Sequence, residues 1–200
     1  DTIATRTGSG NITASNTIAG TSATLSGTLG VTGNTTVGGT LVNTGLITAS
    51  AGVSIGSGGS SNVIDDYEEG TWTAGISAGS GSIALQSSYQ TGLYTKIGDM
   101  VYVNIHIRIG ALSSNSGTLA ITGLPFASPN DTKYRFSGVC SAHFGLQNLG
   151  AGDRLMPYLS SNSSQMNISN ANGNSISSNS NSYMVANQSE MYLTLCYKTS

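Results

Sequence analysis

Residues 25–55 read LSGTLGVTGNTTVGGTLVNTGLITASAGVSI, and this stretch decides the fold of the N-terminal part of the chain. Small residues return every six positions, at Gly27, Gly33, Gly39, Gly45 and Ala51. Two apolar registers share that period: Leu25, Val31, Val37 and Ile55 form one, and Leu29, Leu41, Ile47 and Val53 form the other, two positions out of step. Apolar residues two apart face the same side of a strand, and a recurring glycine marks a bend or a close backbone approach. The period therefore predicts a β-repeat, because nothing recurs at the three-to-four spacing of a helix.

The number of hexads indicates how such a repeat closes. A single-chain β-helix with three hexads per coil would complete fewer than two coils here, below the roughly three repeats that these stacks need. Three chains wound together would bury the apolar residues between them, so we predict a trimeric β-repeat shaft over residues 1–61. The alternative is a disordered Gly/Ser/Thr-rich linker. Disorder usually combines low hydrophobicity with high net charge, whereas residues 2–64 contain an apolar stripe and one charge, Arg6.

Composition changes after the Gly/Ser-rich segment 57–61. All thirteen aromatic residues (one Trp, nine Tyr and three Phe) lie at Tyr67 or beyond. We therefore place a domain boundary at Asn62, between the shaft of residues 1–61 and a head of residues 62–200. The head is long enough to bury a core of its own.

The composition of the whole chain points to an all-β protein. Charged residues are 8% of the chain, against about 25% in typical domains, and the many Thr and few helix-forming runs favour strands. The net charge of −2 gives no footprint for nucleic acid, and no segment predicts membrane insertion. Because the chain opens at Asp1 without Met, we expect a fragment of something longer. Cys140 and Cys196 are expected as buried thiols, with a disulfide as the alternative.

The clearest strand of the head is residues 100–111, MVYVNIHIRIGA. Its apolar residues alternate strictly, at Val101, Val103, Ile105, Ile107 and Ile109, with Tyr102, Asn104, His106 and Arg108 on the other face. This predicts one face on a core and one face toward solvent or a partner subunit. Further strands are predicted over residues 71–77, 82–86, 89–96, 118–122, 134–144, 154–159, 165–169 and 191–197. Short strands at this spacing suggest an antiparallel, jelly-roll-like β-sandwich.

Three motifs carry a resemblance to a known family. DDYEEGTWT at residues 65–73 resembles a signature of tail-fibre and other structural proteins of bacteriophages, in which it opens a β-rich C-terminal domain. Residues 94–101 (YTKIGDMV) and 123–126 (GLPF) are similar to two further segments of that family, in the same order. Ala74 stands where the family usually has Pro. The resemblance implies a homotrimeric virion appendage, assembled in the host cytoplasm, whose N-terminal side meets other virion proteins and whose head engages a host-surface glycan or protein.

Candidate chemistry is sparse, and we expect no enzyme, cofactor or metal site. The carboxylates Asp65, Asp66, Glu68 and Glu69 suit glycoside hydrolysis or calcium only if they converge, and a solvated or Lys/Arg-paired collar is the simpler interpretation. His106 and His143 lack the spacing of a zinc site. The GISAG match to a nucleophile elbow at residues 75–79 is followed by no predicted helix.

Binding is the function that the sequence favours. Tyr102, Asn104, His106 and Arg108 combine aromatic and hydrogen-bonding groups on one strand face, and the alternative is that this face contacts a neighbouring subunit. Tyr158 and Tyr183 flank a Ser/Asn-rich loop, residues 170–181, and are further candidates. Trp72 is expected in the core. We predict a fibre that binds a host receptor, with a purely structural head-fibre or decoration protein, or a glycan-cleaving tailspike using residues such as Asp99 or Asp153, as alternatives.

Overall fold

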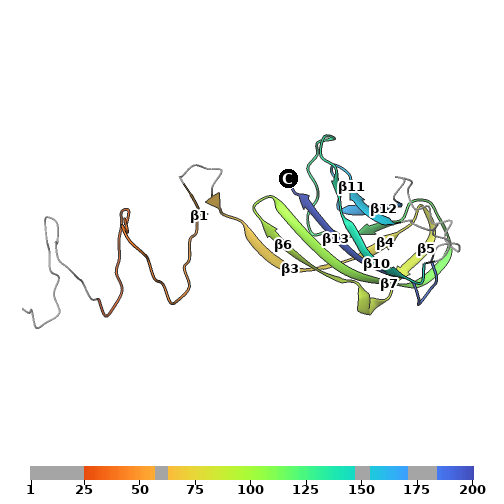
Figure 1. The fold of residues 1–200 in the computed structure, drawn as a ribbon, viewed down its shortest axis with the longest axis horizontal. Coiled ribbons are helices and arrows are strands. Elements are labelled where there is room, and N and C mark those ends of the chain that lie inside the picture. Colours follow the sequence, from red (N-terminus) through yellow and green to blue (C-terminus); the bar gives the residue numbers. More distant parts are fainter. Residues whose placement is uncertain (1–24, 57–62, 147–153, 171–183) are drawn as a thin grey trace, which may run out of the picture. The chain divides into compact units, whose positions relative to one another are not determined.

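A computed structural model of the chain describes residues 25–56, 63–146, 154–170 and 184–200 (Figure 1). Two compact units make up the chain, the first ending at Ile47 and the second comprising Thr48–Ser200. The boundary expected at Asn62 stays a prediction of where the fibrous part ends. His143 lies in a described strand, but its side chain, Tyr183, Asp153 and all but the first residue of the 170–181 loop lie outside the described residues.

The hexads impose a six-residue rhythm on the backbone. The chain bends at residues 26–27, 32–33, 38–39 and 44–45 and turns at 50–51, each time at the small residue of the hexad. The prediction that these residues mark bends is therefore confirmed. The closed trimeric shaft is not seen: residues 25–52 contain no strand, and residues 25–51 are all exposed. The physical reason is that a strand needs a hydrogen-bonding neighbour and its apolar face needs a covering surface, and residues 25–52 alone supply neither.

A small hairpin opens the second unit. Strand β1 (Val53–Ser54) pairs antiparallel with β2 (Val63–Ile64). Gly52 has a φ of +86°, and a Cβ there would lie 2.7 Å from the Cβ of Asp65. This position therefore requires glycine, both for its left-handed backbone and for the close approach of the chain beyond β2.

Two antiparallel sheets form the head. The six-stranded sheet has the order β10-β13-β7-β6-β3, with β5 paired to β7, and its strands are β3 (Tyr67–Thr73), β5 (Ser80–Leu85), β6 (Thr91–Ile97), β7 (Met100–Ser116), β10 (Val139–Phe144) and β13 (Glu190–Lys198). The five-stranded sheet has the order β4-β8-β12-β11-β9, and its strands are β4 (Gly75–Ser77), β8 (Ala120–Thr122), β9 (Phe136–Ser137), β11 (Leu155–Leu159) and β12 (Gln165–Asn170). A 3-10 turn, η2 (Ser87–Tyr89), precedes β6. The predicted antiparallel sandwich is confirmed.

Strand β7 is the central element of the fold and curves along the whole head (Figure 1). Its first part pairs with β6 and β13, and its last part pairs with β5. The apolar face predicted for residues 100–111 is buried, with each of its five aliphatic side chains at most 2% exposed. These side chains share one core with Ile121, Leu159 and Ile168 of the opposite sheet and with Trp72, which is 5% exposed. The expectation of a buried Trp72 is confirmed.

Every predicted strand of the head corresponds to an observed one, but two of them divide. The strand predicted over residues 71–77 breaks at Ala74 into β3 and β4, and that over 134–144 breaks at Gly138 into β9 and β10. Each break is a point where the chain crosses between the two sheets. The hairpins β6–β7 and β11–β12 instead keep consecutive strands within one sheet.

The cysteines differ from expectation. Cys196 is exposed and Cys140 is half-buried, and no disulfide joins them. Cys196 lies opposite Tyr102 in the β7–β13 register. Its side chain therefore faces away from the core, while those of Leu195 and Tyr197 on either side point into the core.

Candidate functional site

The outer face of the six-stranded sheet brings together side chains that are far apart in the sequence. Across β7 and β13, the register pairs Tyr102 with Cys196, Asn104 with Thr194, His106 with Tyr192, and Arg108 with Glu190. Directly opposed residues of an antiparallel pair share a face. The outward face predicted for residues 100–111 therefore continues onto a strand that begins more than 70 residues later.

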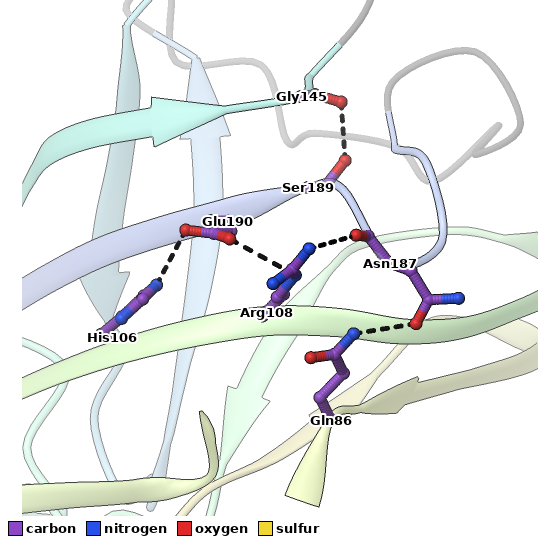
Figure 2. A network of polar contacts seen from close by, with 7 residues as sticks. All are labelled: Gln86, His106, Arg108, Gly145, Asn187, Ser189 and Glu190. Atoms are coloured by element: carbon purple, nitrogen blue, oxygen red, sulfur yellow. Dashed lines mark hydrogen bonds and ion pairs between the residues drawn. The ribbon is translucent and has the colours of Figure 1, made fainter. Parts of the chain in front are cut away.

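A polar network forms where β7 leaves β6 and meets β5 (Figure 2). Glu190 lies between two basic side chains: its Oε1 is 3.3 Å from Arg108 Nε, and its Oε2 is 3.1 Å from His106 Nε2. Arg108 Nη2 also donates to the backbone oxygen of Asn187 at 2.5 Å. The buried Nε of Arg108 is not aligned for a hydrogen bond to Glu190, so that contact acts as an ion pair.

Aromatic rings surround this network. The His106 ring stacks on Tyr192 at 4.3 Å between centroids and meets Tyr89 edge-on at 4.7 Å. The Arg108 guanidinium lies 5.8 Å from the centre of the Tyr89 ring, and Phe144 packs edge-on against Tyr192 at 6.0 Å. Stacked and edge-on pairs of this kind hold ring orientation. His106 is thus held in a fixed position, with half-buried rings on both sides.

The turn before β13 is fixed by its own hydrogen bonds. The Gln86 amide donates to Asn187 Oδ1 at 2.8 Å, and Asn187 takes a left-handed backbone with a φ of 61°. The buried hydroxyl of Ser189 accepts from the Val185 N–H at 2.7 Å and donates to the Gly145 carbonyl at 2.8 Å. These bonds place the backbone oxygen of Asn187 where Arg108 reaches it (Figure 2).

The opposite end of the same face, where β3 begins, is apolar. We define the basal patch as Tyr67, Leu93, Ile97, Met100 and Tyr102, which are between 47% and 62% exposed. Tyr67 opposes Ile97 across β3 and β6, and Ile97 opposes Met100 across β6 and β7. A shallow depression of about 400 Å³ adjoins the patch, lined by Glu69, Gly70, Thr71, Leu93, Tyr94 and Thr95.

Three of the four carboxylates of the 65–73 motif contact neighbouring side chains. Asp66 forms an ion pair with the buried Lys96, whose Nζ lies 5.5 Å from the centre of the Phe126 ring. Glu68 accepts a hydrogen bond from the Tyr94 hydroxyl, and this bond raises the pKa of Tyr94. Glu69 accepts from the Tyr67 hydroxyl at 3.0 Å, which raises the pKa of Tyr67. For Asp66, the interpretation as a Lys-paired collar agrees with this geometry.

The structure sorts the predicted site residues into groups. His106 and Arg108 lie together in the polar network, whereas Tyr102 belongs to the basal patch. Asn104 lies between the two and donates to Thr194 Oγ1 at 3.3 Å. Tyr158 is on β11 of the other sheet, paired with Asn167 and Ser137, so it is not part of this face.

Sequence reasoning missed the partners of the two network residues. These are Gln86, Tyr89, Asn187, Glu190 and Tyr192. The alternation of polar and apolar residues in β13 indicates that Glu190 and Tyr192 face outward. Nothing in the sequence shows that β13 pairs with β7, because 84 residues separate His106 from Glu190.

Neither a metal-binding cluster nor a membrane-spanning helix is found among the described residues. There, no group of three or more His, Cys, Asp or Glu side chains is placed to hold a metal ion. In that same part of the chain, no helix has the length and hydrophobicity to cross a membrane.

Comparison with known proteins shows a similarity of fold only. No family model matches the chain, and no curated protein matches it. Among solved structures, the crystal structure of the Dettilon tailspike protein (gp208) is similar, with a TM-score of 0.56 and 22% sequence identity. The match covers 66% of this chain but 24% of that protein, so the chain corresponds to about a quarter of the tailspike's length. The fold of this chain is therefore similar to that of part of a bacteriophage tailspike.

Proposed function

We propose that this chain is part of a bacteriophage virion appendage, a trimeric fibre whose C-terminal head binds a saccharide receptor on the host surface. The fold similarity to part of a tailspike supports the virion location. The hexad rhythm of residues 25–51, exposed along its whole length, supports a shaft that closes only between chains. Other virion proteins would then bind on the N-terminal side, and neither nucleic acid nor a membrane is a partner.

One observation carries the receptor-binding part of this proposal. Rings of Tyr89, His106 and Tyr192 gather beside the charged groups of Arg108 and Glu190 at one end of an open sheet face. Aromatic surfaces suit the C–H faces of sugars, and a few fixed polar groups suit their hydroxyls. Because the Arg108 and Glu190 charges offset each other, a neutral saccharide fits this end better than a strongly charged one.

Binding would gain strength from the number of sites. A site on a sheet face makes few contacts with a sugar, so each head would bind weakly. Three heads on one stalk turn later binding events into intramolecular ones, which raises avidity without new contacts. The appendage would therefore attach firmly to a surface that displays many copies of the same saccharide.

We propose binding without catalysis. Four of the acidic side chains are already engaged: Asp66 with Lys96, Glu68 with Tyr94, Glu69 with Tyr67, and Asp99 with Lys198 at 3.1 Å. Glycoside hydrolysis instead uses two carboxyl groups that face each other across the scissile bond.

The experiment is a glycan array and a host-cell binding assay with the full chain. Tyr192→Ala removes the ring stacked on His106 and should weaken apparent affinity at least tenfold. The matched control is Tyr158→Ala, on the other sheet, which should bind as the wild type does. Fluorescence of Trp72, the chain's one tryptophan, reports whether each variant keeps its core.

Other results would select another function. Failure of the wild-type chain to bind any glycan or host cell would favour a structural head-fibre or decoration protein. Release of reducing ends from host polysaccharide, lost in Asp99→Asn or Asp153→Asn, would identify a glycan-cleaving tailspike. Equal loss of binding in Tyr192→Ala and Tyr158→Ala would place the receptor site elsewhere on the head.

A further inference from the structure

The basal patch is an unusual surface for an isolated domain. Five large side chains, each between 47% and 62% exposed, lie side by side on β3, β6 and β7. Contiguous exposed apolar patches generally mark an interaction surface, whereas single exposed residues do not. We therefore expect another surface to pack on the basal patch.

The surroundings of the patch have the anatomy of a protein interface. Charged groups stand beside the apolar residues: Lys198, opposite Met100, forms an ion pair with Asp99 at 3.1 Å, and the Glu69 carboxylate accepts the Tyr67 hydroxyl at 3.0 Å. Interfaces characteristically have an apolar centre and a polar rim.

The chain just upstream identifies the partner. Val53, Ile55 and Ile64, in and beside the β1–β2 hairpin, are between 40% and 63% exposed. An isolated two-stranded sheet is marginally stable in water, so the hairpin needs the same kind of cover as the hexads. Only Asp65 and Asp66 separate Ile64 from Tyr67, the first residue of the patch. Exposed apolar side chains that need cover are therefore found in the hexads, in and beside the β1–β2 hairpin, and at the start of the head.

We propose that the basal patch is where the heads of the trimer meet, with the three copies of the patch packed around the three-fold axis. This inference rests on the trimer proposed above. Chains that come together along residues 25–64 bring their Tyr67 positions together, since the connection is only two residues long. In a closed ring of three, every copy of the patch is covered, whereas an open chain of contacts would leave the patches at its two ends exposed.

The same inference separates the two uses of the sheet face. Arg108 lies six positions beyond Tyr102 on β7, which is about 20 Å along a strand. A contact confined to the basal patch therefore covers Tyr102 and leaves Arg108 accessible. The sequence left open whether this face binds a ligand or contacts a neighbouring subunit. In this arrangement one end of the face contacts the neighbouring subunit and the other end binds the ligand.

Cys196 provides the test, because it is exposed in the single chain and lies opposite Tyr102. The experiment uses the full chain with Cys140→Ser, so that Cys196 is its one thiol, and measures native mass and the rate of reaction with a thiol reagent. We expect a trimer in which Cys196 reacts at least tenfold more slowly than in the same chain carrying Ile97→Asp. The matched control, Met156→Asp, changes an exposed residue of β11 on the other sheet and should leave Cys196 protected.

The outcomes separate this inference from the proposed trimer. A trimer in which Cys196 reacts as fast with wild-type Ile97 as with Ile97→Asp overturns the inference, because the hexads alone would then hold the copies together. A monomer overturns both the inference and the trimeric part of the proposed function. If Ile97→Asp does not fold, as judged by Trp72 fluorescence, wild-type Cys196 reactivity is compared above and below the concentration at which the trimer dissociates.

Discussion

Residues 25–56 and the head use similar patterns of apolar residues with opposite results. In β7, Val103, Ile105 and Ile107 alternate with polar residues and are at most 2% exposed. In the hexads, Val37 and Leu41 follow a rule just as regular and are 48% and 70% exposed. The difference is whether the same chain supplies a second apolar surface. The sequence period of the apolar residues therefore predicts which side chains share a face. Whether that face is buried depends on whether the same chain supplies a second layer of secondary structure to pack on it.

The strongest way to test this contrast is to shorten one aliphatic side chain in each region. Ile107→Ala opens a cavity in the closed core and should lower the free energy of unfolding of the head by about 3 kcal/mol. Val37→Ala removes two methyl groups that are half exposed, so it should change the unfolding of the head by less than about 0.5 kcal/mol. Urea unfolding followed by Trp72 fluorescence measures both. A comparable loss in the two variants would mean that the hexads pack on the head.

Glycine gives a second, smaller contrast. A Cβ at Gly138 would collide with the backbone oxygen of Thr194, whereas a Cβ at Gly33 meets no atom within 4 Å. Gly138→Ala should therefore cost the head about 2 kcal/mol, and Gly33→Ala should leave it unchanged. If Gly33→Ala nevertheless lowers the thermal stability of the oligomer, the hexad glycines mark close approach between chains. Thermal melts followed by light scattering and by Trp72 fluorescence separate the two effects.

High pH should lower the stability of the head but not affect residues 25–56. Burial raises the pKa of Tyr197 from 10.0 to about 12, although its hydroxyl donates to the Phe126 carbonyl at 2.9 Å. Because the unfolded chain gives up this proton first, stability is unchanged below pH 10 and falls as the pH rises toward 12. The loss should be about 1 kcal/mol at pH 11. Residues 25–56 contain no titratable side chain, so they should be insensitive to this change.

The control for the pH experiment is Tyr197→Phe, compared with wild type in urea unfolding at pH 9 and pH 11. This variant loses one hydrogen bond at both pH values, and its additional loss at pH 11 should be smaller than that of wild type. An equal additional loss in both proteins would assign the effect to other tyrosines, such as Tyr67 and Tyr94, whose pKa values are also raised.

Local pattern was enough to predict most of the head. The strict alternation of residues 100–111 gave both the strand and its buried face, and every other predicted strand of the head has an observed counterpart. The breaks at Ala74 and Gly138 were not predictable, because crossing between sheets depends on which strands pair. The partners of His106 and Arg108 were missed for the same reason, since Glu190 reaches them only through the β7–β13 register. The hexad pattern predicted the bends but not the burial of its apolar residues, because residues 25–52 contain no strand and no second apolar layer.

The pairing of β3 with β6 also has a mechanical consequence. Seven register pairs, from Tyr67 with Ile97 to Thr73 with Thr91, join the first strand of the head to the rest of the sheet. A pull on the chain ahead of Tyr67, resisted at the far end of β7, runs along these strands, so it shears all seven pairs together instead of peeling them one by one. The chain thus enters the head in the direction that best withstands tension.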